Sequence, residues 1–85
     1  MKHTAEFQAP ISLSALQPGE RARIVDIQAL GPVRRRLLGM GFLRGEILRV
    51  VKHAPMGDPF ELVLKGYHLS LRREESACIY VQREV

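Results

Sequence analysis

The clearest pattern in the sequence is an alternation of apolar and polar residues between positions 60 and 71. Phe60–Leu64 and Tyr67–Leu71 both alternate, and only Lys65 and Gly66 separate them, which is typical of a tight β-hairpin. The register set by this turn pairs Leu64 with Tyr67, Leu62 with Leu69, and Phe60 with Leu71. A slip of one residue would turn half of these side chains towards water. The sequence therefore predicts this register, with all six apolar side chains in the core.

Three other segments are predicted to be strands. Arg21–Ile27 carries apolar residues on both faces, as expected for a strand that bends from one layer of a small barrel into the other. Glu46–His53 is predicted to be a second such strand. Ala77, Ile79 and Val81 alternate and are predicted to form the inner face of the last strand.

One short helix is predicted after the first of these strands. Pro32 suits the first helical position, and Gly41 suits the left-handed position just after a helix. Val33, Leu37 and Met40 are spaced i, i+4, i+7 and are predicted to be the buried stripe. A helix of about two turns is not stable alone, so it must pack on the sheet.

The remaining segments are predicted to be turns and loops. Ser12–Leu16 is predicted to form at most a short helical turn, with Ser12 or Ser14 as its cap. Residues 54–59 contain two prolines and a glycine, so we expect a loop there. Residues 72–76 are predicted to be a polar connector with at most one 3₁₀ turn.

Five to six short strands with one short helix after the first strand predict a mainly β fold. The expected architecture is a small, strongly bent antiparallel barrel of the SH3-like kind. The 85 residues leave room for one domain, predicted over residues 12–85, and residues 1–11 are predicted to be a flexible arm.

Composition and charge narrow the class of protein. Lys and Arg total 13 against 9 Asp and Glu, so the net charge is a mild +4. The one cysteine, Cys78, allows no internal disulfide. Neither a signal peptide nor a run of ~20 apolar residues is visible. The sequence therefore predicts a cytoplasmic protein that does not insert into a membrane.

No catalytic or metal-binding pattern is visible in the sequence. It contains neither a phosphate-binding P-loop motif nor a Gly-x-Ser-x-Gly elbow, and Cys78 has no predicted base beside it. His3, His53 and His68 lack partners at metal-ligand spacing, although Asp58 follows His53 by five residues. These histidines are predicted to be solvent-facing polar residues. We expect no enzymatic activity, no cofactor and no resident metal.

A cluster of arginines raises the alternative of nucleic-acid binding. Arg34, Arg35 and Arg36 spread over about 200° of a helix and cannot all contact one phosphate backbone. Nucleic-acid proteins usually add stacking aromatic residues, and this chain has five aromatic residues in all. The alternative, which would add Arg72 and Arg73, stays open, but nucleic acid is not the expected partner.

An apolar surface patch is the better candidate site. Several apolar residues lie next to predicted turns, where a small soluble protein often binds a partner. The candidate contact residues are Leu38, Phe42, Leu43 and Met56, rimmed by Arg34 and Arg36. Phe42 and Leu38 have a second interpretation, in which they plug the open end of the barrel.

Four segments, in this order, resemble the FeoA family, ferrous iron transport protein A. They are LSALQPG (13–19), RRLLGMGF (35–42), APMGDP (54–59) and GYHLSLR (66–72). The resemblance implies an SH3-like fold and a cytoplasmic role in bacterial ferrous iron uptake. The implied partner is FeoB, a membrane transporter with a GTP-binding domain. Whether the protein would assemble the transporter, or stimulate GTP hydrolysis with an arginine, stays open, as does weak self-association through edge strands.

Overall fold

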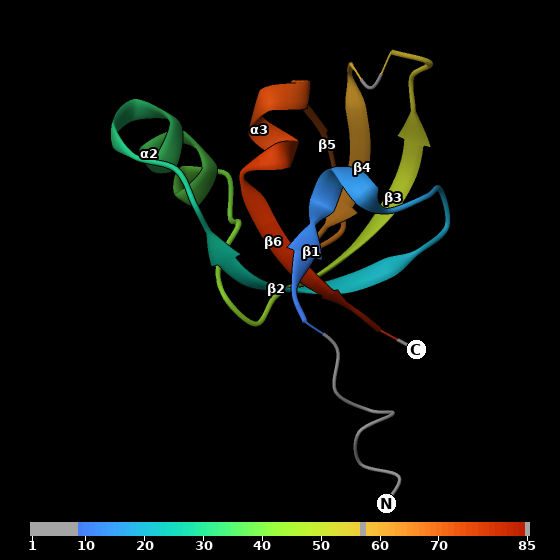
Figure 1. Ribbon diagram of the computed structural model, residues 1–85, viewed down its shortest axis with the longest axis horizontal. Helices are drawn as coiled ribbons and strands as arrows, with labels where there is room; N and C mark the ends of the chain where they lie inside the picture. Colours follow the sequence, from blue (N-terminus) through green and yellow to red (C-terminus); the bar gives the residue numbers. More distant parts are fainter. Residues whose placement is uncertain (1–8, 57, 85) are drawn as a thin grey trace, which may run out of the picture.

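The computed structural model describes residues 9–56 and 58–84 of the protein. Most residues in regular secondary structure belong to strands, and short helices lie between the strands (Figure 1). The elements in chain order are β1 (Ile11–Ser12), the 3₁₀ helix η1 (Leu13–Ala15), β2 (Arg21–Ile27), α2 (Gly31–Gly39), β3 (Ile47–His53), β4 (Phe60–Leu64), β5 (Tyr67–Leu71), α3 (Arg73–Ala77) and β6 (Ile79–Arg83). The predicted mainly β class is confirmed.

The six strands form one antiparallel sheet in the order β1-β6-β2-β3-β4-β5. The sheet bends around the core, so that β2 and β6 cross β3 and β4 rather than lying flat beside them (Figure 1). The pairing shifts between Ile24 and Asp26 in β2 and between Val50 and Lys52 in β3. Such bulges increase local twist and bend a strand, which explains how so short a sheet curves.

The predicted hairpin register is confirmed at every pair from Phe60–Leu71 to Leu64–Tyr67. Lys65 and Gly66 have φ angles of 54° and 81°, the two positive values of a type I′ turn. The predicted burial of Tyr67 is wrong, because its side chain is 72% exposed. β5 is the last strand of the sheet, so no further strand of the described residues covers the inner face at Tyr67.

The predicted helix is confirmed as α2, but its buried stripe is shorter than predicted. Leu37 is fully buried and Met40 is half-buried against the core, whereas Val33 is 40% exposed. Figure 1 shows α2 projecting from the sheet, and Leu37, in the second half of the helix, is its buried residue. Gly41 has a φ of 104° and reverses the chain, so that Phe42 N donates to Leu37 O at 3.1 Å.

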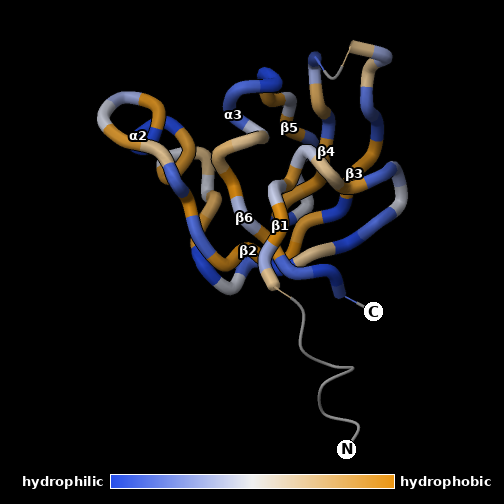
Figure 2. Tube along the Cα trace, viewed as in Figure 1, coloured by the Kyte–Doolittle hydropathy of each residue, from blue (hydrophilic) through white to orange (hydrophobic). Residues whose placement is uncertain are grey.

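The core lies inside the bent sheet. Figure 2 shows polar and apolar positions alternating along the strands, as a sheet with one buried face requires. Phe42 is fully buried and belongs to the core, and Leu38 is half-buried and packs against that core. Leu13 and Leu16 of the N-terminal turn are also fully buried, and the side chain of Ser12 accepts a hydrogen bond from Ser14 N.

Three predictions about the chain ends need correction. Ile11, assigned to the arm, pairs with Val81 in β1, a strand of two residues that is too short for a visible alternation. The predicted polar connector is the helix α3, because the Glu75 side chain accepts a hydrogen bond from Arg72 N at 2.9 Å and holds its first turn. Ala77 ends α3 and is exposed, whereas Ile79 and Val81 are buried as predicted. Ala9 and Pro10 are exposed and belong to no helix or strand, and residues 1–8 of the predicted arm lie outside the described residues.

Candidate functional site

The structure divides the predicted contact patch between two sides of the molecule. Arg34, Arg36 and Leu38 lie on α2 and Leu43 follows it, whereas Met56 lies in the loop between β3 and β4. Figure 1 shows α2 and this loop at opposite sides of the domain. Phe42 belongs to the core and is removed from the candidate contact residues. The single patch expected from the sequence is therefore not formed.

The first candidate surface surrounds α2. Leu30, which precedes the helix, is 88% exposed, Val33 is 40% exposed, and Leu43 is 43% exposed. These are three of the five large apolar side chains that the described residues expose; the others are Met56 and Tyr67. We call this region the α2 surface, and its members are Leu30, Val33, Arg34, Arg36, Leu38 and Leu43. Sequence reasoning missed Val33 because it assigned Val33 to the core.

Two of the arginines hold α2 in place. Arg34 Nη1 donates to Ile27 O at 2.8 Å, and Arg36 Nε lies 2.7 Å from Glu75 Oε2. Glu75 is 8% exposed, so its carboxylate depends on its two donors, Arg36 Nε and Arg72 N. Arg35 is exposed and makes no contact of this kind with the described residues. The arginine run is thus only partly available to a ligand.

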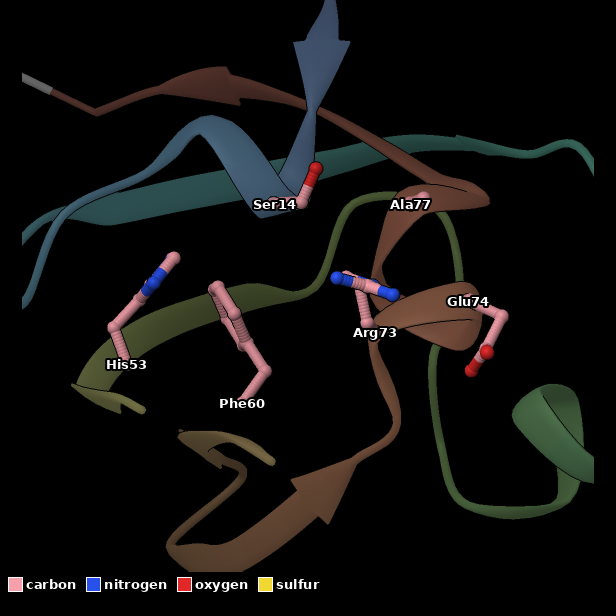
Figure 3. Close-up of a pocket in the computed structure, with 6 residues that line it drawn as sticks. All are labelled: Ser14, His53, Phe60, Arg73, Glu74 and Ala77. Carbon is pink, nitrogen blue, oxygen red and sulfur yellow. The ribbon is translucent and has the colours of Figure 1, made fainter. Parts of the chain in front are cut away.

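The second candidate surface is an open groove of about 540 Å³ (Figure 3). It lies between η1, the start of β4, the end of β3 and α3. Its lining residues are Ser14, His53, Phe60, Arg73, Glu74 and Ala77. Arg73 Nη1 donates to Met56 O at 3.2 Å, which ties the β3–β4 loop to α3. Figure 3 shows the Glu74 carboxylate pointing away from Phe60, so Arg73 is the charged group nearest the centre of the groove.

His53 is half-buried in this groove, which differs from the predicted solvent-facing position. Its ring meets the edge of Phe60 with centroids 4.6 Å apart and an interplanar angle of 67°. Its Nε2 atom is buried and has no hydrogen-bond partner among the described residues. The alternation of β3 did not reveal the half-buried position of His53, because His53 is the last residue of the strand and pairs with the buried Phe60.

The described residues offer little reaction chemistry. Residues 9–56 and 58–84 contain no group of three His, Cys, Asp or Glu side chains that could hold a metal ion. The Cys78 thiol donates to Glu74 O at 3.2 Å at the end of α3. The absence of a resident metal and of a cofactor stays a prediction. No helix in this part of the chain is long and apolar enough to cross a membrane.

Shifted pKa values lie outside both surfaces. The pKa of Glu20 is lowered from its usual 4.5, first by the backbone N–H of Gln17 and then by the side chain of Arg83. The pKa of Asp26 is lowered from 3.8, first by the side chain of Gln28 and then by the backbone N–H of Ile27. These carboxylates stabilise turns and strand ends and do not belong to either candidate surface.

A comparison with protein families supplies the decisive observation. The FeoA domain model matches residues 11–83. The chain belongs to the FeoA family. The match begins at Ile11, the residue at which β1 starts, and ends with β6. It therefore spans the whole sheet of this FeoA domain.

Individual relatives agree with this assignment. A fusion protein of Fe(2+) transport protein A and the Fe(2+) transporter FeoB from Porphyromonas gingivalis is 43% identical over 70 residues, which are 82% of this chain and 8% of the fusion protein. The chain thus spans only a small part of that relative.

Two solved structures share the fold. A FeoA-like protein from Clostridium acetobutylicum has a TM-score of 0.84 at 34% identity, covering 93% of this chain and 92% of its own. FeoA from Stenotrophomonas maltophilia, solved with zinc and described as a prokaryotic SH3 domain protein, has a TM-score of 0.74 at 28% identity, covering 88% and 91%. The predicted SH3-like fold is confirmed.

Proposed function

We propose that this FeoA domain is a non-enzymatic accessory subunit of bacterial ferrous iron uptake that binds the cytoplasmic part of FeoB. The observation that carries the proposal is the Porphyromonas gingivalis relative, in which a FeoA sequence and FeoB occur in one chain. Fusion keeps two domains at a high effective concentration, which suits domains that act on each other. A separate FeoA domain needs a contact surface to obtain the same proximity.

The α2 surface is our candidate for this contact. It presents three exposed apolar side chains, those of Leu30, Val33 and Leu43, and exposed apolar side chains often mark a partner site. Because α2 projects from the sheet, Leu30 and Val33 can enter a partner's groove without displacing the core (Figure 1). Arg34 and Arg36 already bind Ile27 O and Glu75, so the helix is held rigidly before it binds.

The alternative of nucleic-acid binding receives less support. It would use five arginines, and three of them have contacts within the chain. Arg34 binds Ile27 O, Arg36 binds Glu75, and Arg73 binds Met56 O. A phosphate backbone would have to replace these contacts. Binding of this kind would weaken steeply with salt, because counterions are released when phosphates are neutralised.

The proposal is tested by co-purification with full-length FeoB in detergent, with and without GTP. Leu30→Asp places a charge on the α2 surface, and aspartate is a good N-cap, so the variant should fold at least as well as the parent. Met56→Asp is the matched control at an exposed apolar residue on the other side. We expect Leu30→Asp to weaken binding at least about tenfold and Met56→Asp to leave it unchanged.

Other outcomes are informative. Loss of binding with Met56→Asp alone would indicate that FeoB contacts the side of the groove, where Arg73 binds Met56 O, rather than the α2 surface. Parent protein that fails to bind FeoB with or without nucleotide would contradict the proposed function itself. Retained binding by both variants would contradict the α2 surface as the contact.

A further inference from the structure

The strand β5 ends the sheet and leaves one edge open. Among the described residues, β5 pairs with β4 alone. In a hairpin with a two-residue turn, the pairs Leu64–Tyr67 and Leu62–Leu69 exchange hydrogen bonds with each other. The backbone N–H and C=O groups of the intervening residues, His68 and Ser70, therefore point outward. They form a row of donors and acceptors that a further strand can pair with.

The inner face of β5 is also incompletely covered. Leu71 is 1% exposed and Leu69 is half-buried, but Tyr67 is 72% exposed although it lies on the same face. The exposed fraction of these side chains therefore rises from Leu71 to Tyr67, the residue next to the hairpin turn. An added strand would cover Tyr67 and Leu69 with its own apolar side chains.

The edge of β5 lacks the features that normally prevent strand addition. Natural edge strands carry lysine, proline or a bulge, which block pairing with other chains. Tyr67–Leu71 contains no Lys, Arg, Asp, Glu or Pro, and its pairing with β4 has no register shift. Positive charge appears only outside the strand, at Lys65 on one side and at Arg72 on the other.

We propose that the β5 edge binds an extended segment of another protein that has an uncharged, β-branched centre and acidic ends. Such a segment would pair with His68 and Ser70, cover Tyr67, and place its acidic ends near Lys65 and Arg72. Lys65 Nζ lies 3.4 Å from Glu46 Oε2, and 45% of the Lys65 side chain is exposed. Lys65 is therefore available to a second carboxylate.

A second copy of this chain is disfavoured at this edge in the register centred on Leu69. Antiparallel pairing of two β5 strands centred on Leu69 would place Lys65 of each copy opposite Arg73 of the other, and Gly66 opposite Arg72. Like charges would meet at both ends of the added pair, which is unfavourable. This proposal uses neither the α2 surface nor FeoB, so it stands or fails independently of the proposed function.

The test uses isotope-labelled protein and a synthetic nine-residue peptide that alternates valine and threonine and ends in two glutamates on each side. We expect amide shift changes at Tyr67, His68 and Ser70, and slower hydrogen exchange at His68 and Ser70. The first control peptide ends in lysines and should bind about tenfold more weakly. The second is N-methylated at consecutive central amides, which blocks both of its edges, and should not bind.

A variant of the protein completes the test. Ser70→Pro removes one outward N–H, a position where an edge strand tolerates proline, and should abolish the peptide-induced shifts while the rest of the spectrum keeps its dispersion. Equal binding of the N-methylated peptide, shifts confined to the groove at Ser14 and Ala77, or no shifts at all would overturn the proposal. Protection of His68 and Ser70 that rises with protein concentration alone would overturn the choice of a foreign partner, because it would indicate self-pairing.

Discussion

Arg36 and Glu75, which are 39 residues apart in the sequence, form an ion pair with 2.7 Å between Nε and Oε2. The pair joins α2 to α3. Glu75 Oε1 also accepts the backbone N–H of Arg72 at 2.9 Å, so one nearly buried carboxylate holds the start of α3 and the side of α2. The position of the α2 surface therefore depends on a contact with the last part of the chain.

We predict that removing either partner destabilises the protein by different amounts. Arg36→Ala should lower the free energy of unfolding by about 0.5–1 kcal/mol, because the Arg36 side chain is 54% exposed and water screens the pair. Glu75→Ala should cost about 1.5–3 kcal/mol, since it also removes the acceptor of Arg72 N. Urea denaturation of both single variants and the double variant measures the coupling. Fully additive effects would show that the pair does not stabilise the fold.

The exposure of α2 predicts a contrast between two of its residues. Leu37→Ala should lower the free energy of unfolding by about 2–4 kcal/mol, because Leu37 is the one fully buried side chain of this helix. Val33→Ala, at a residue that is 40% exposed, should cost no more than about 0.5 kcal/mol. Thermal and urea denaturation give both values. Similar losses in the free energy of unfolding for the two variants would show that Val33 is buried together with Leu37, as the sequence predicted.

Alanine is predicted to have opposite effects at two glycines, Gly66 in the hairpin turn and Gly39 in α2. Gly66 has a φ of 81° in the type I′ turn, so Gly66→Ala should destabilise the protein by about 1 kcal/mol or more. Gly39 is helical, and a methyl group added at its Cα would meet open space, so Gly39→Ala should stabilise the protein by roughly 0.5–1 kcal/mol. Differential scanning calorimetry of both variants measures the sign. A stabilising Gly66→Ala would contradict the turn type.

The carboxylate of Glu20 predicts a pH dependence of stability. Its pKa in the folded protein is lowered from 4.5, chiefly by the hydrogen bond from Gln17 N at 2.7 Å. The stabilisation is therefore complete above the unfolded-state pKa and is lost as the pH falls through the lower, folded-state pKa. The stability difference between the parent and Glu20→Gln should shrink as the pH is lowered below about 4.5. A difference that stays constant from neutral to acidic pH would contradict this role.

The local parts of the fold could be predicted from the sequence, and the non-local parts could not. The hairpin follows from alternation and a two-residue turn, which the sequence displays directly. Tyr67 has the same pattern as Leu69 but is exposed, because strand order is a tertiary property that places β5 at an edge. The helix boundaries follow from Pro32 and Gly41, whereas the projection of α2 depends on what lies beneath it.

The candidate site shows the same limit. Exposure of Leu43 and Met56 was expected from turns beside them, yet their separation required the arrangement of α2 and the β3–β4 loop. The groove and the half-buried His53 combine residues from three parts of the chain, so no sequence spacing reveals them. The proposed association with FeoB rests on family membership and on the fusion protein rather than on any motif of reacting groups.

The most direct test of the account is an NMR footprint of the labelled protein on addition of the cytoplasmic region of FeoB. We predict that the amide signals of Leu30, Val33 and Leu43 broaden first, while those of Ala77 in the groove keep their intensity. Undiminished intensities throughout the spectrum, or broadening confined to residues outside the α2 surface, would contradict the claim that this FeoA domain acts through α2.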